Sequence, residues 1–323
     1  MQALVCERYG PPEVLAFREV ERPEPGSREA LIRVHATSVN RTDLETLRGH
    51  PFFARLATGV RRPRYPIPGS EFAGRVEAVG PGVSELAVGE DVFGLSADRF
   101  GAHAEYLVLR EDGPLATIPP GLRHREVASA MEGSHYALSC LDAAEVRPGD
   151  RVLVYGATGA IGTAAVQLAK HQGATVTAVC DPHGTEAVAS LGADVVIDRT
   201  LQDVRAMRGR FDLVLDAVGG TTFRRCRHLL APGAPYLSTD LGPGWQNVAL
   251  IPLTRIVGDH RVLIPLPTDL RGHVLLIREL LASGGFRPVI DRTFAFEDIV
   301  DAYRYVASKR KLGTVVVTLT SGD

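Results

Sequence analysis

The stretch VYGATGAIGTAA, residues 154–165, decides how the middle of the chain folds. An apolar run ends there in seven residues that hold three glycines, Gly156, Gly159 and Gly162. Small and apolar residues follow at helical spacing, so the stretch predicts a strand, a sharp turn and a helix. Glycine at every third position leaves the backbone without a Cβ, as a close approach to another group requires.

A turn of this kind is typical of dinucleotide-binding sites. The helix N-terminus supplies free N–H donors and a partial positive charge for a pyrophosphate. Gly159 and Gly162 fit the positions of close approach and helix packing, whereas Ala157 replaces the first glycine of the usual GxGxxG pattern. A tight turn that binds nothing is the alternative. The flanking strand and helix, and a second strand ending at Cys180 and Asp181, favour the dinucleotide.

Strands and helices alternate in the second part of the chain. We expect strands at residues 151–155, 175–180, 194–198, 211–216 and 234–240, and helices at residues 161–171, 186–191 and 222–230. Such alternation indicates a parallel sheet with crossover helices. The segments RVLVYGATGAIG and FDLVLDAVGG are weakly alike, as the two halves of a doubly wound nucleotide-binding fold would be.

The first 120 residues have a different texture, with short β-branched runs between Gly and Pro residues. This pattern predicts a small β-barrel or sandwich. After about residue 265 we expect a helix, a strand, a second helix and a last strand, which pack back on that first domain.

Composition bounds the function. The chain has 323 residues, 45% apolar and 23% charged, with a net charge of −2. It lacks the basic surplus that a nucleic acid or an anionic membrane would need in a partner. Four scattered cysteines without a CxxC pair predict neither structural zinc nor a disulfide framework, which fits a cytoplasmic location. No signal peptide or membrane span is expected.

Several long segments resemble the medium-chain dehydrogenase/reductase superfamily. GATGAIGTAAVQLAKHQGATVTAVC and SLGADVVID are similar to its cofactor domain. ATSVNRTDLETLRG and PGSEFAGRVEAVGPGVSELAVGEDVFG are similar to its GroES-like catalytic domain. The resemblance implies an α/β protein with a GroES-like, β-rich catalytic domain at residues 1–122 and 265–323. A Rossmann domain, which is a doubly wound parallel sheet, is expected at residues 123–264.

Zinc-dependent members of the superfamily carry Cys and His where this chain has Asn40 and Ser70. Asn and Ser cannot replace a thiolate and an imidazole as zinc ligands. The chain therefore resembles the zinc-independent quinone oxidoreductase branch. That implies NAD(P)H-dependent hydride transfer to a quinone, an enone or a similar activated double bond, with hydrogen bonds stabilising the developing charge. The resemblance places Asn40 beside the nicotinamide; a turn or helix cap is its alternative role.

Tyr136 stands where relatives often have a threonine near the nicotinamide. A tyrosine, with an ordinary pKa of about 10, can donate a proton to an enolate or a hydroquinone anion. Packing as a half-buried aromatic is its alternative role. His135, Glu132 and Tyr65 are further candidates for substrate contact. Some enoyl-thioester reductases use a tyrosine just after the glycine that corresponds to Gly49, and its absence here disfavours the thioester reaction.

Cofactor preference depends on the end of the second strand, in VCDPHG. Asp181 would repel a 2′-phosphate and favours NAD, unless it only starts an Asp-Pro turn, whereas His183 can attract the phosphate. Branch membership implies NADP, with NAD as the alternative. The predicted cofactor contacts are Gly156, Thr158, Gly159, Ala160, Ile161, Gly162, Cys180, Asp181, His183, Val218, Gly219, Ser238, Thr239, Lys311 and Gly313.

The substrate itself is expected to be a small molecule, selected by loops such as residues 48–68 and 240–268. Related enzymes lead us to expect a homodimer. Two other functions stay open, a tailoring reductase for one biosynthetic intermediate and a cofactor-binding protein with little catalytic activity.

Overall fold

The structure is a computed structural model that describes residues 1–265 and 268–320. The chain divides into two compact units, which we call the first and second unit. The first unit comprises Met1–Glu132 and Leu270–Asp323, and the second comprises Gly133–Asp269. The predicted catalytic segment 265–323 includes residues 266–267 and 321–323, which lie outside the described residues.

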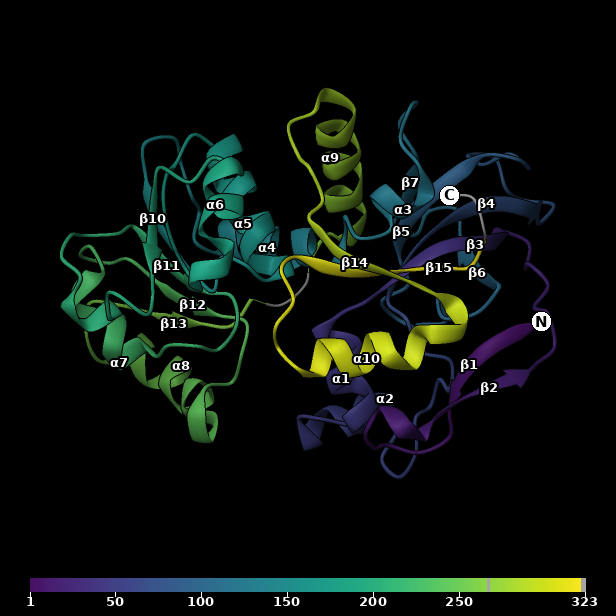
Figure 1. Cartoon of the computed structure of the whole chain (residues 1–323), viewed down its shortest axis with the longest axis horizontal. Helices are drawn as coiled ribbons and strands as arrows, with labels where there is room; N and C mark the ends of the chain where they lie inside the picture. The colour runs from purple at the N-terminus through teal and green to yellow at the C-terminus, as the bar shows by residue number, and fades with distance from the viewer. Residues whose placement is uncertain (266–267, 321–323) are drawn as a thin grey trace. The chain divides into compact units, whose positions relative to one another are not determined.

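The second unit is built on a six-stranded parallel sheet in the order β10-β9-β8-β11-β12-β13. Its strands are β8 (Arg151–Tyr155), β9 (Thr175–Cys180), β10 (Val195–Asp198), β11 (Leu213–Asp216), β12 (Tyr236–Ser238) and β13 (Val262–Leu263). Its helices are α4 (Glu132–Ala143), α5 (Ala160–His171), α6 (Thr185–Ser190), α7 (Phe223–Cys226) and α8 (Gln246–Ile256). This strand order, with α4, α5 and α6 on one side of the sheet and α7 and α8 on the other (Figure 1), confirms the predicted Rossmann fold.

Two segments of the second unit differ from expectation. The helix predicted over residues 222–230 is instead α7 followed by a 3-10 turn at Arg227–Leu229. The buried residues Cys226, Leu229 and Leu230 have the i, i+3, i+4 spacing of an amphipathic α-helix, which is why the pattern predicts one continuous helix here. The predicted loop over residues 240–268 contains helix α8. The sequence did not predict this helix because it includes Pro252, and proline usually interrupts a helix.

The first unit is β-rich, as its resemblance to GroES-like domains predicts. Its main sheet has seven strands, ordered β14-β15-β3-β4-β5-β7, with β6 paired to β3. These are β3 (Glu29–Val39), β4 (Glu71–Val79), β5 (Asp91–Leu95), β6 (Tyr106–Arg110), β7 (Leu115–Thr117), β14 (Ile290–Ala295) and β15 (Thr314–Thr318); β1 (Gln2–Cys6) and β2 (Leu15–Glu19) pair separately. The helices are α1 (Arg41–Arg48), α2 (Arg55–Thr58), α3 (His124–Val127), α9 (Leu270–Ser283) and α10 (Ile299–Ala307).

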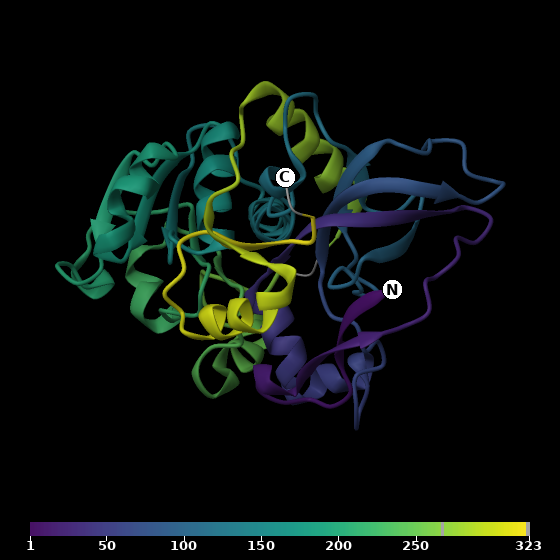
Figure 2. The same cartoon turned by 45° about the vertical axis from the view of Figure 1, so that its right-hand side comes forward.

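The C-terminal elements of the first unit pack on its N-terminal ones, as predicted. β15 pairs with β3, and α10 lies beside α1, as Figure 2 shows. Leu44 of α1, Tyr303 of α10 and Val315 of β15 belong to one apolar core. These contacts fix α1, whose N-cap is the predicted site residue Asn40.

A buried carboxylate holds the turn that follows β11. Asp216 is 0% exposed and accepts hydrogen bonds from the N–H groups of Val218 (3.3 Å), Gly220 (3.0 Å) and Thr221 (3.2 Å). The Tyr236 hydroxyl on β12 donates a fourth bond, at 3.1 Å. One side chain therefore shapes the glycine turn at the carboxyl end of β11.

Replacing Asp216 with Asn should destabilise the protein. The amide would present N–H groups to backbone donors, so the free energy of unfolding should fall by about 1–3 kcal/mol. Tyr236→Phe removes one donor only and should cost about 1 kcal/mol. Urea denaturation of the three proteins measures both losses. An Asp216→Asn protein as stable as wild type would show that the carboxylate does not hold this turn.

Candidate functional site

The glycine turn lies at the carboxyl ends of the parallel strands, where the strand order reverses. β8 is flanked by β9 on one side and β11 on the other, and Gly156 follows β8 directly. Open parallel sheets bind ligands in the crevice at this topological switch point. The sequence and the topology therefore select the same edge of the sheet.

The three glycines of the turn have different roles. Gly156 has a φ of +80°, and a Cβ on it would lie 2.3 Å from Val218 Cγ2. A Cβ on Gly162 would lie 2.2 Å from the carbonyl oxygen of Gly156, so α5 packs directly on the turn. A Cβ on Gly159 would meet only ordinary contacts, the nearest being Val218 Cγ1 at 3.4 Å. Gly156 and Gly162 are thus required by the fold, whereas Gly159 is not.

This turn fits a dinucleotide pyrophosphate. Gly159 is the N-cap of the twelve-residue helix α5, and no side chain caps the helix there. The first N–H groups of an α-helix have no partner within the helix and favour an anion. Gly159 removes the side chain at the point where that anion would approach the backbone. The residues present therefore fit the cofactor that the sequence predicts.

The other predicted cofactor residues of the second unit lie at the same edge. Cys180 ends β9 and is buried, and Asp181 and the exposed His183 follow it. Val218 is 38% exposed, and Gly219, with a φ of +68°, shares its turn. The remaining predicted contacts around the same strand ends are Thr158, Ala160 and Ile161 after β8, and Ser238 and Thr239 at the end of β12.

Arg199 was missed by the sequence analysis. It follows β10 directly, and its N–H donates to the carbonyl of Cys180 at 2.9 Å. Its guanidinium donates to Asp181 Oδ1, from Nε at 2.6 Å and from the terminal Nη2 at 2.5 Å. Asp181 is therefore neutralised by an arginine at the end of the neighbouring strand. The register of β9 with β10 creates this pair, and motif reading along β9 alone could not find it.

The different roles of the glycines can be separated by substitution. Gly162→Ala should lower the free energy of unfolding by about 1–3 kcal/mol, because the new methyl meets backbone atoms that cannot move aside. Gly159→Ala should unfold like wild type and bind NADPH roughly tenfold more weakly, a loss of about 1.4 kcal/mol. Thermal unfolding and NADPH fluorescence titration measure the two effects. Unchanged NADPH binding by Gly159→Ala would contradict a dinucleotide site at this turn.

In the first unit, Asn40 begins α1. Its Oδ1 accepts a hydrogen bond from the N–H of Asp43 at 2.9 Å, and the Asp43 carboxylate accepts one from the N–H of Asn40 at 3.0 Å. This reciprocal cap follows from Asn at the N-cap and an acid three residues later. The Asn40 side chain also donates from Nδ2 to Ser70 Oγ at 3.0 Å. Asn40 thus has the capping role that was its alternative, and it is completely buried.

Further polar side chains gather beside this cap. The Thr42 hydroxyl donates to Glu132 Oε1 at 2.6 Å, and the Glu132 N–H donates to Glu71 Oε2 at 2.8 Å. We call Asn40, Thr42, Asp43, Ser70, Glu71 and Glu132 the polar cluster. They come from α1, from the start of β4 and its preceding residue, and from the first residue of α4.

The three carboxyl groups of the polar cluster resist ionisation. Burial raises the pKa of Asp43 to about 7, and the charge of Glu132 adds to that rise. Burial raises the pKa of Glu71 well above its usual value, again with Glu132 adding to the effect. Burial also raises the pKa of Glu132, although the Thr42 hydroxyl opposes it. The cluster therefore binds protons that exposed carboxylates would release.

The remaining predicted site residues lie elsewhere. Lys311, just before β15, donates to the carbonyl of Gly313, and it is close enough to the polar cluster for the charges of Glu132 and Glu71 to act on it. Tyr65 is half-buried, with the Arg64 guanidinium 5.6 Å from its ring centre. His135 and Tyr136 are neighbours on α4, the first buried and the second half-buried. The rings of His135 and Tyr136 have their centres 5.6 Å apart.

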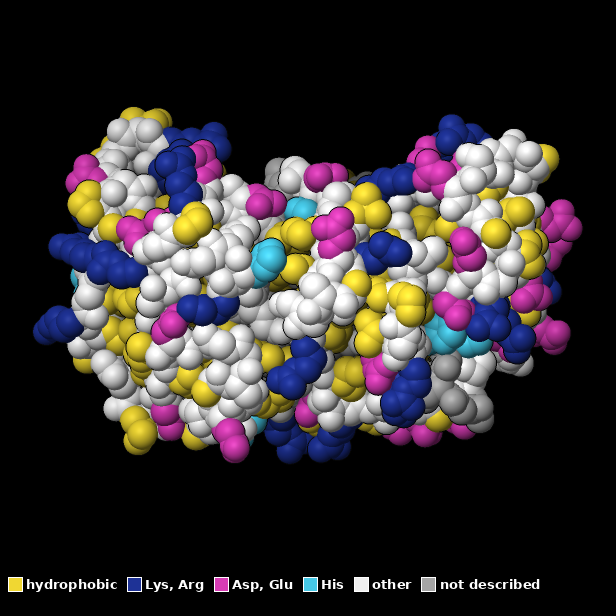
Figure 3. Space-filling view, turned by 90° about the horizontal axis from the view of Figure 1, so that it is seen from above, with side chains coloured by type: hydrophobic (Ala, Val, Ile, Leu, Met, Phe, Trp, Pro, Cys, Tyr) yellow, Lys and Arg dark blue, Asp and Glu magenta, His cyan; other side chains and the backbone are white. Residues whose placement is uncertain are grey.

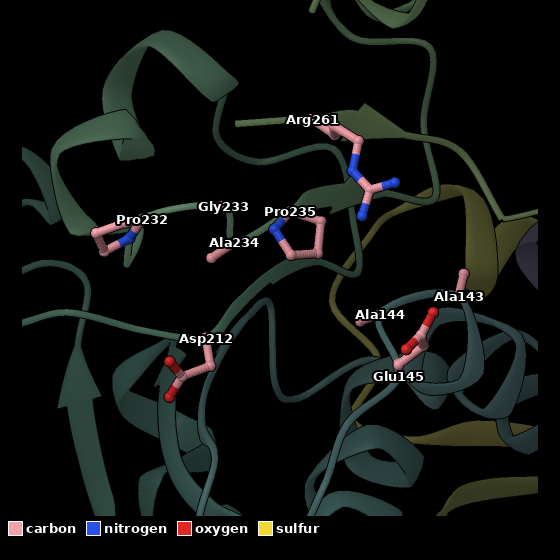
Figure 4. A pocket seen from close by; sticks show the side chains of 9 residues that line it. All are labelled: Ala143, Ala144, Glu145, Asp212, Pro232, Gly233, Ala234, Pro235 and Arg261. Atoms are coloured by element: carbon pink, nitrogen blue, oxygen red, sulfur yellow. The ribbon is translucent and has the colours of Figure 1, made fainter. Parts of the chain in front are cut away.

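A pocket of about 250 Å³ lies at the opposite edge of the parallel sheet, as Figure 4 shows. Asp212, Pro235 and Arg261, which line it, directly precede β11, β12 and β13. Asp212 Oδ2 accepts a hydrogen bond from the N–H of Arg151 at 2.9 Å. On the molecular face of Figure 3, acidic and basic side chains are interspersed.

No helix within the described residues is long and apolar enough to span a membrane.

The chain is similar to dehydrogenases and reductases over nearly its whole length. Residues 26–120 match the alcohol dehydrogenase GroES-like domain, and residues 191–317 match the family described as zinc-binding dehydrogenase. Trans-enoyl reductase pgmF of Aspergillus terreus is 31% identical over 91% of this chain and 87% of its own length. The mitochondrial NAD(P)H oxidoreductase RTN4IP1 of Mus musculus is 30% identical over 99% and 89%. The quinone oxidoreductase from Coxiella burnetii has a TM-score of 0.88 at 26% identity, covering 99% of both chains.

These matches, together with the two folds, show that the chain belongs to the medium-chain dehydrogenase/reductase superfamily. It is an oxidoreductase of that type, and its class uses a nicotinamide cofactor. The glycine turn described above is the part of the chain that suits such a cofactor.

The zinc named by one matched family does not fit the residues present. Asn40 and Ser70 are hydrogen-bonded to each other, and neither is a residue type that holds zinc. Across residues 1–265 and 268–320, no group of three or more His, Cys, Asp or Glu side chains is arranged to hold a metal ion.

Proposed function

We propose that the protein is a zinc-independent NAD(P)H-dependent reductase of quinones, enones or similar activated double bonds. The observation that carries this proposal is the hydrogen bond between Asn40 and Ser70, the residues that replace the Cys and His of zinc-dependent relatives. Three buried carboxyl groups lie beside this pair. Alcohol oxidation without a Lewis acid would leave an alkoxide poorly stabilised. Reduction of a conjugated system spreads the negative charge onto an oxygen that hydrogen bonds can stabilise.

The chain's own residues have separate tasks in this proposal. The bound cofactor supplies a hydride. The N-terminus of α5 and the open face of Gly159 hold its pyrophosphate. The turn after β11, held by Asp216, presents Val218 and Gly219. The polar cluster supplies hydrogen bonds and exchangeable protons, and Tyr136 is the alternative proton donor.

The named relatives support this proposal and one variant of it. One relative is named a trans-enoyl reductase, and one similar structure is named a quinone oxidoreductase. A chain 31% identical to the trans-enoyl reductase over 91% of its length also fits a tailoring reductase that acts on one biosynthetic intermediate. The two functions share hydride chemistry and differ in the substrate that they accept.

Activity with a substrate panel tests the proposal. Purified protein should oxidise NADPH in the presence of a quinone, an enone or an enoyl thioester, and a chelator should leave the rate unchanged. It should not oxidise simple alcohols with NADP⁺. Preference for an enoyl thioester would favour the tailoring reductase. Tight NADPH binding without turnover of any of these compounds would favour a cofactor-binding protein instead.

NADP is the cofactor that we propose. Asp181 alone would repel a 2′-phosphate, but Arg199 neutralises it and brings a guanidinium to the ends of β9 and β10. Arginine is well suited to phosphate because its planar fork can donate two hydrogen bonds. His183 lies nearby in the sequence and is exposed. The pair therefore supports an NADP site that retains an acidic residue.

Substituting Arg199 tests this preference. Arg199→Ala should weaken NADPH binding roughly tenfold, about 1.4 kcal/mol, and leave NADH binding less affected. Asp181→Ser should strengthen NADPH binding by removing the competing carboxylate. Arg147→Ala is a matched control, because Arg147 precedes β8 at the other edge of the sheet and pairs with Glu145. Wild-type protein that binds NADH as tightly as NADPH would contradict the assignment.

A further inference from the structure

Three carboxyl groups are buried together in the polar cluster. Asp43 and Glu71 are each 1% exposed, and Glu132 is 6% exposed. Two hydrogen bonds connect the elements that carry them, from Thr42 to Glu132 and from the Glu132 backbone to Glu71. Carboxylates so placed repel one another in a medium of low polarity, so full ionisation of all three is unfavourable.

Glu71 has two unlike oxygens. Oε2 accepts the bond from the Glu132 N–H, whereas Oε1 is buried and makes no hydrogen bond. The Ser38 hydroxyl, which acts on the Glu71 carboxyl, is also buried and without a hydrogen bond of ordinary geometry. A bare carboxylate oxygen in this position would be costly. A hydrogen bond between Oε1 and Ser38 Oγ satisfies both atoms in either form, because the hydroxyl can donate to a carboxylate and can accept from a protonated carboxyl. Ser38 itself lowers the pKa of Glu71 against the effect of burial.

Charge balance in the polar cluster favours the protonated form of Glu71. The cationic groups that act on the cluster are Lys311 and Arg41, against three carboxyls. Lys311 is shared with Asp291 of β14, and burial lowers its pKa. The Tyr303 hydroxyl of α10, whose ring is completely buried, lies within the influence of Asp43. A bound proton removes the excess negative charge that these groups leave uncompensated.

We propose that Glu71 is a neutral carboxylic acid at neutral pH and that the polar cluster stores the proton consumed in the reduction. The inference rests on the proposed function, because adding hydrogen across a double bond takes one hydride and one proton. The hydride goes to the electrophilic carbon. Glu71 releases its proton, becoming a carboxylate, and the enolate or hydroquinone anion is neutralised. Solvent then returns a proton to the cluster through partly exposed Thr42.

Infrared spectroscopy of the cofactor-free protein tests the stored proton directly. At pH 7 the wild-type protein should show the C=O stretch of protonated carboxyl groups. Glu71→Gln should weaken that band and leave the share of Asp43, whose pKa burial raises to about 7. Glu77→Gln is the control, because Glu77 lies on the same strand, is exposed and pairs with Arg22. Glu132→Gln should keep the band and shift the pH at which it disappears downward, because the charge of Glu132 raises the pKa of Glu71. A band unchanged in Glu71→Gln would overturn the proposal.

Kinetics tests the use of that proton. With a substrate that wild-type protein reduces, Glu71→Gln should lower kcat about a hundredfold and leave NADPH affinity unchanged. Wild-type kcat should fall as pH rises through the pKa of the store, and the variant should lose this dependence. Normal kcat in Glu71→Gln would exclude the store as the proton source. Failure of wild-type protein to reduce any substrate would instead contradict the proposed function, while the infrared result would still decide where the proton is.

Discussion

The second unit depends on a contact that exists because one side chain is missing. The carbonyl oxygen of Gly156 occupies the space where a Cβ of residue 162 would lie, at 2.2 Å. Helix α5 can therefore begin directly on top of the turn that leaves β8, and its N-terminus points to the switch point of the sheet. Moving α5 outward by the width of a methyl group would separate the helix N-terminus from the turn. The position of the proposed cofactor site is thus set by packing, before any cofactor contact is made.

The two units manage buried charge in different ways. In the second unit, Asp216 receives four hydrogen-bond donors and Asp181 receives a guanidinium, so each acid has a local partner. In the first unit, Asp43, Glu71 and Glu132 each accept a hydrogen bond, and the lysine whose charge acts on Glu71 and Glu132 is Lys311, which also interacts with Asp291. The first arrangement gives each acid hydrogen-bond donors, and at Asp216 it shapes a turn. The second arrangement favours binding of a proton, and in the proposed mechanism that proton is used in the reaction.

Features carried by local sequence were predictable. The glycine turn, the parallel sheet with crossover helices and the GroES-like unit followed from motifs that are continuous along the chain, and the structure and the relatives confirm them. Arg199 and Glu71 were not assigned these roles, because each acquires its partner through strand pairing or packing between distant segments. Asp181 and Arg199 are 18 residues apart, and Glu71 and Glu132 are 61 apart. Helix α8 was missed for a local reason, since Pro252 is a residue that usually ends helices.

In the first unit, Asn40 and Ser70 stand where zinc-dependent relatives have Cys and His, and this difference has an electrostatic consequence. A thiolate and an imidazole surround a cation with ligands that need its charge, whereas an amide and a hydroxyl are neutral and can bond to each other. The carboxyls Asp43 and Glu71 beside them then lack a strong positive centre. In the metal-free site proposed here, protonation neutralises those carboxyls at the lowest free-energy cost. The charge of Lys311 also acts on Asp291, and burial disfavours the charged form of this lysine. An enzyme that reduces activated double bonds needs a proton at each turnover, so the same imbalance that follows from removing a metal site provides it.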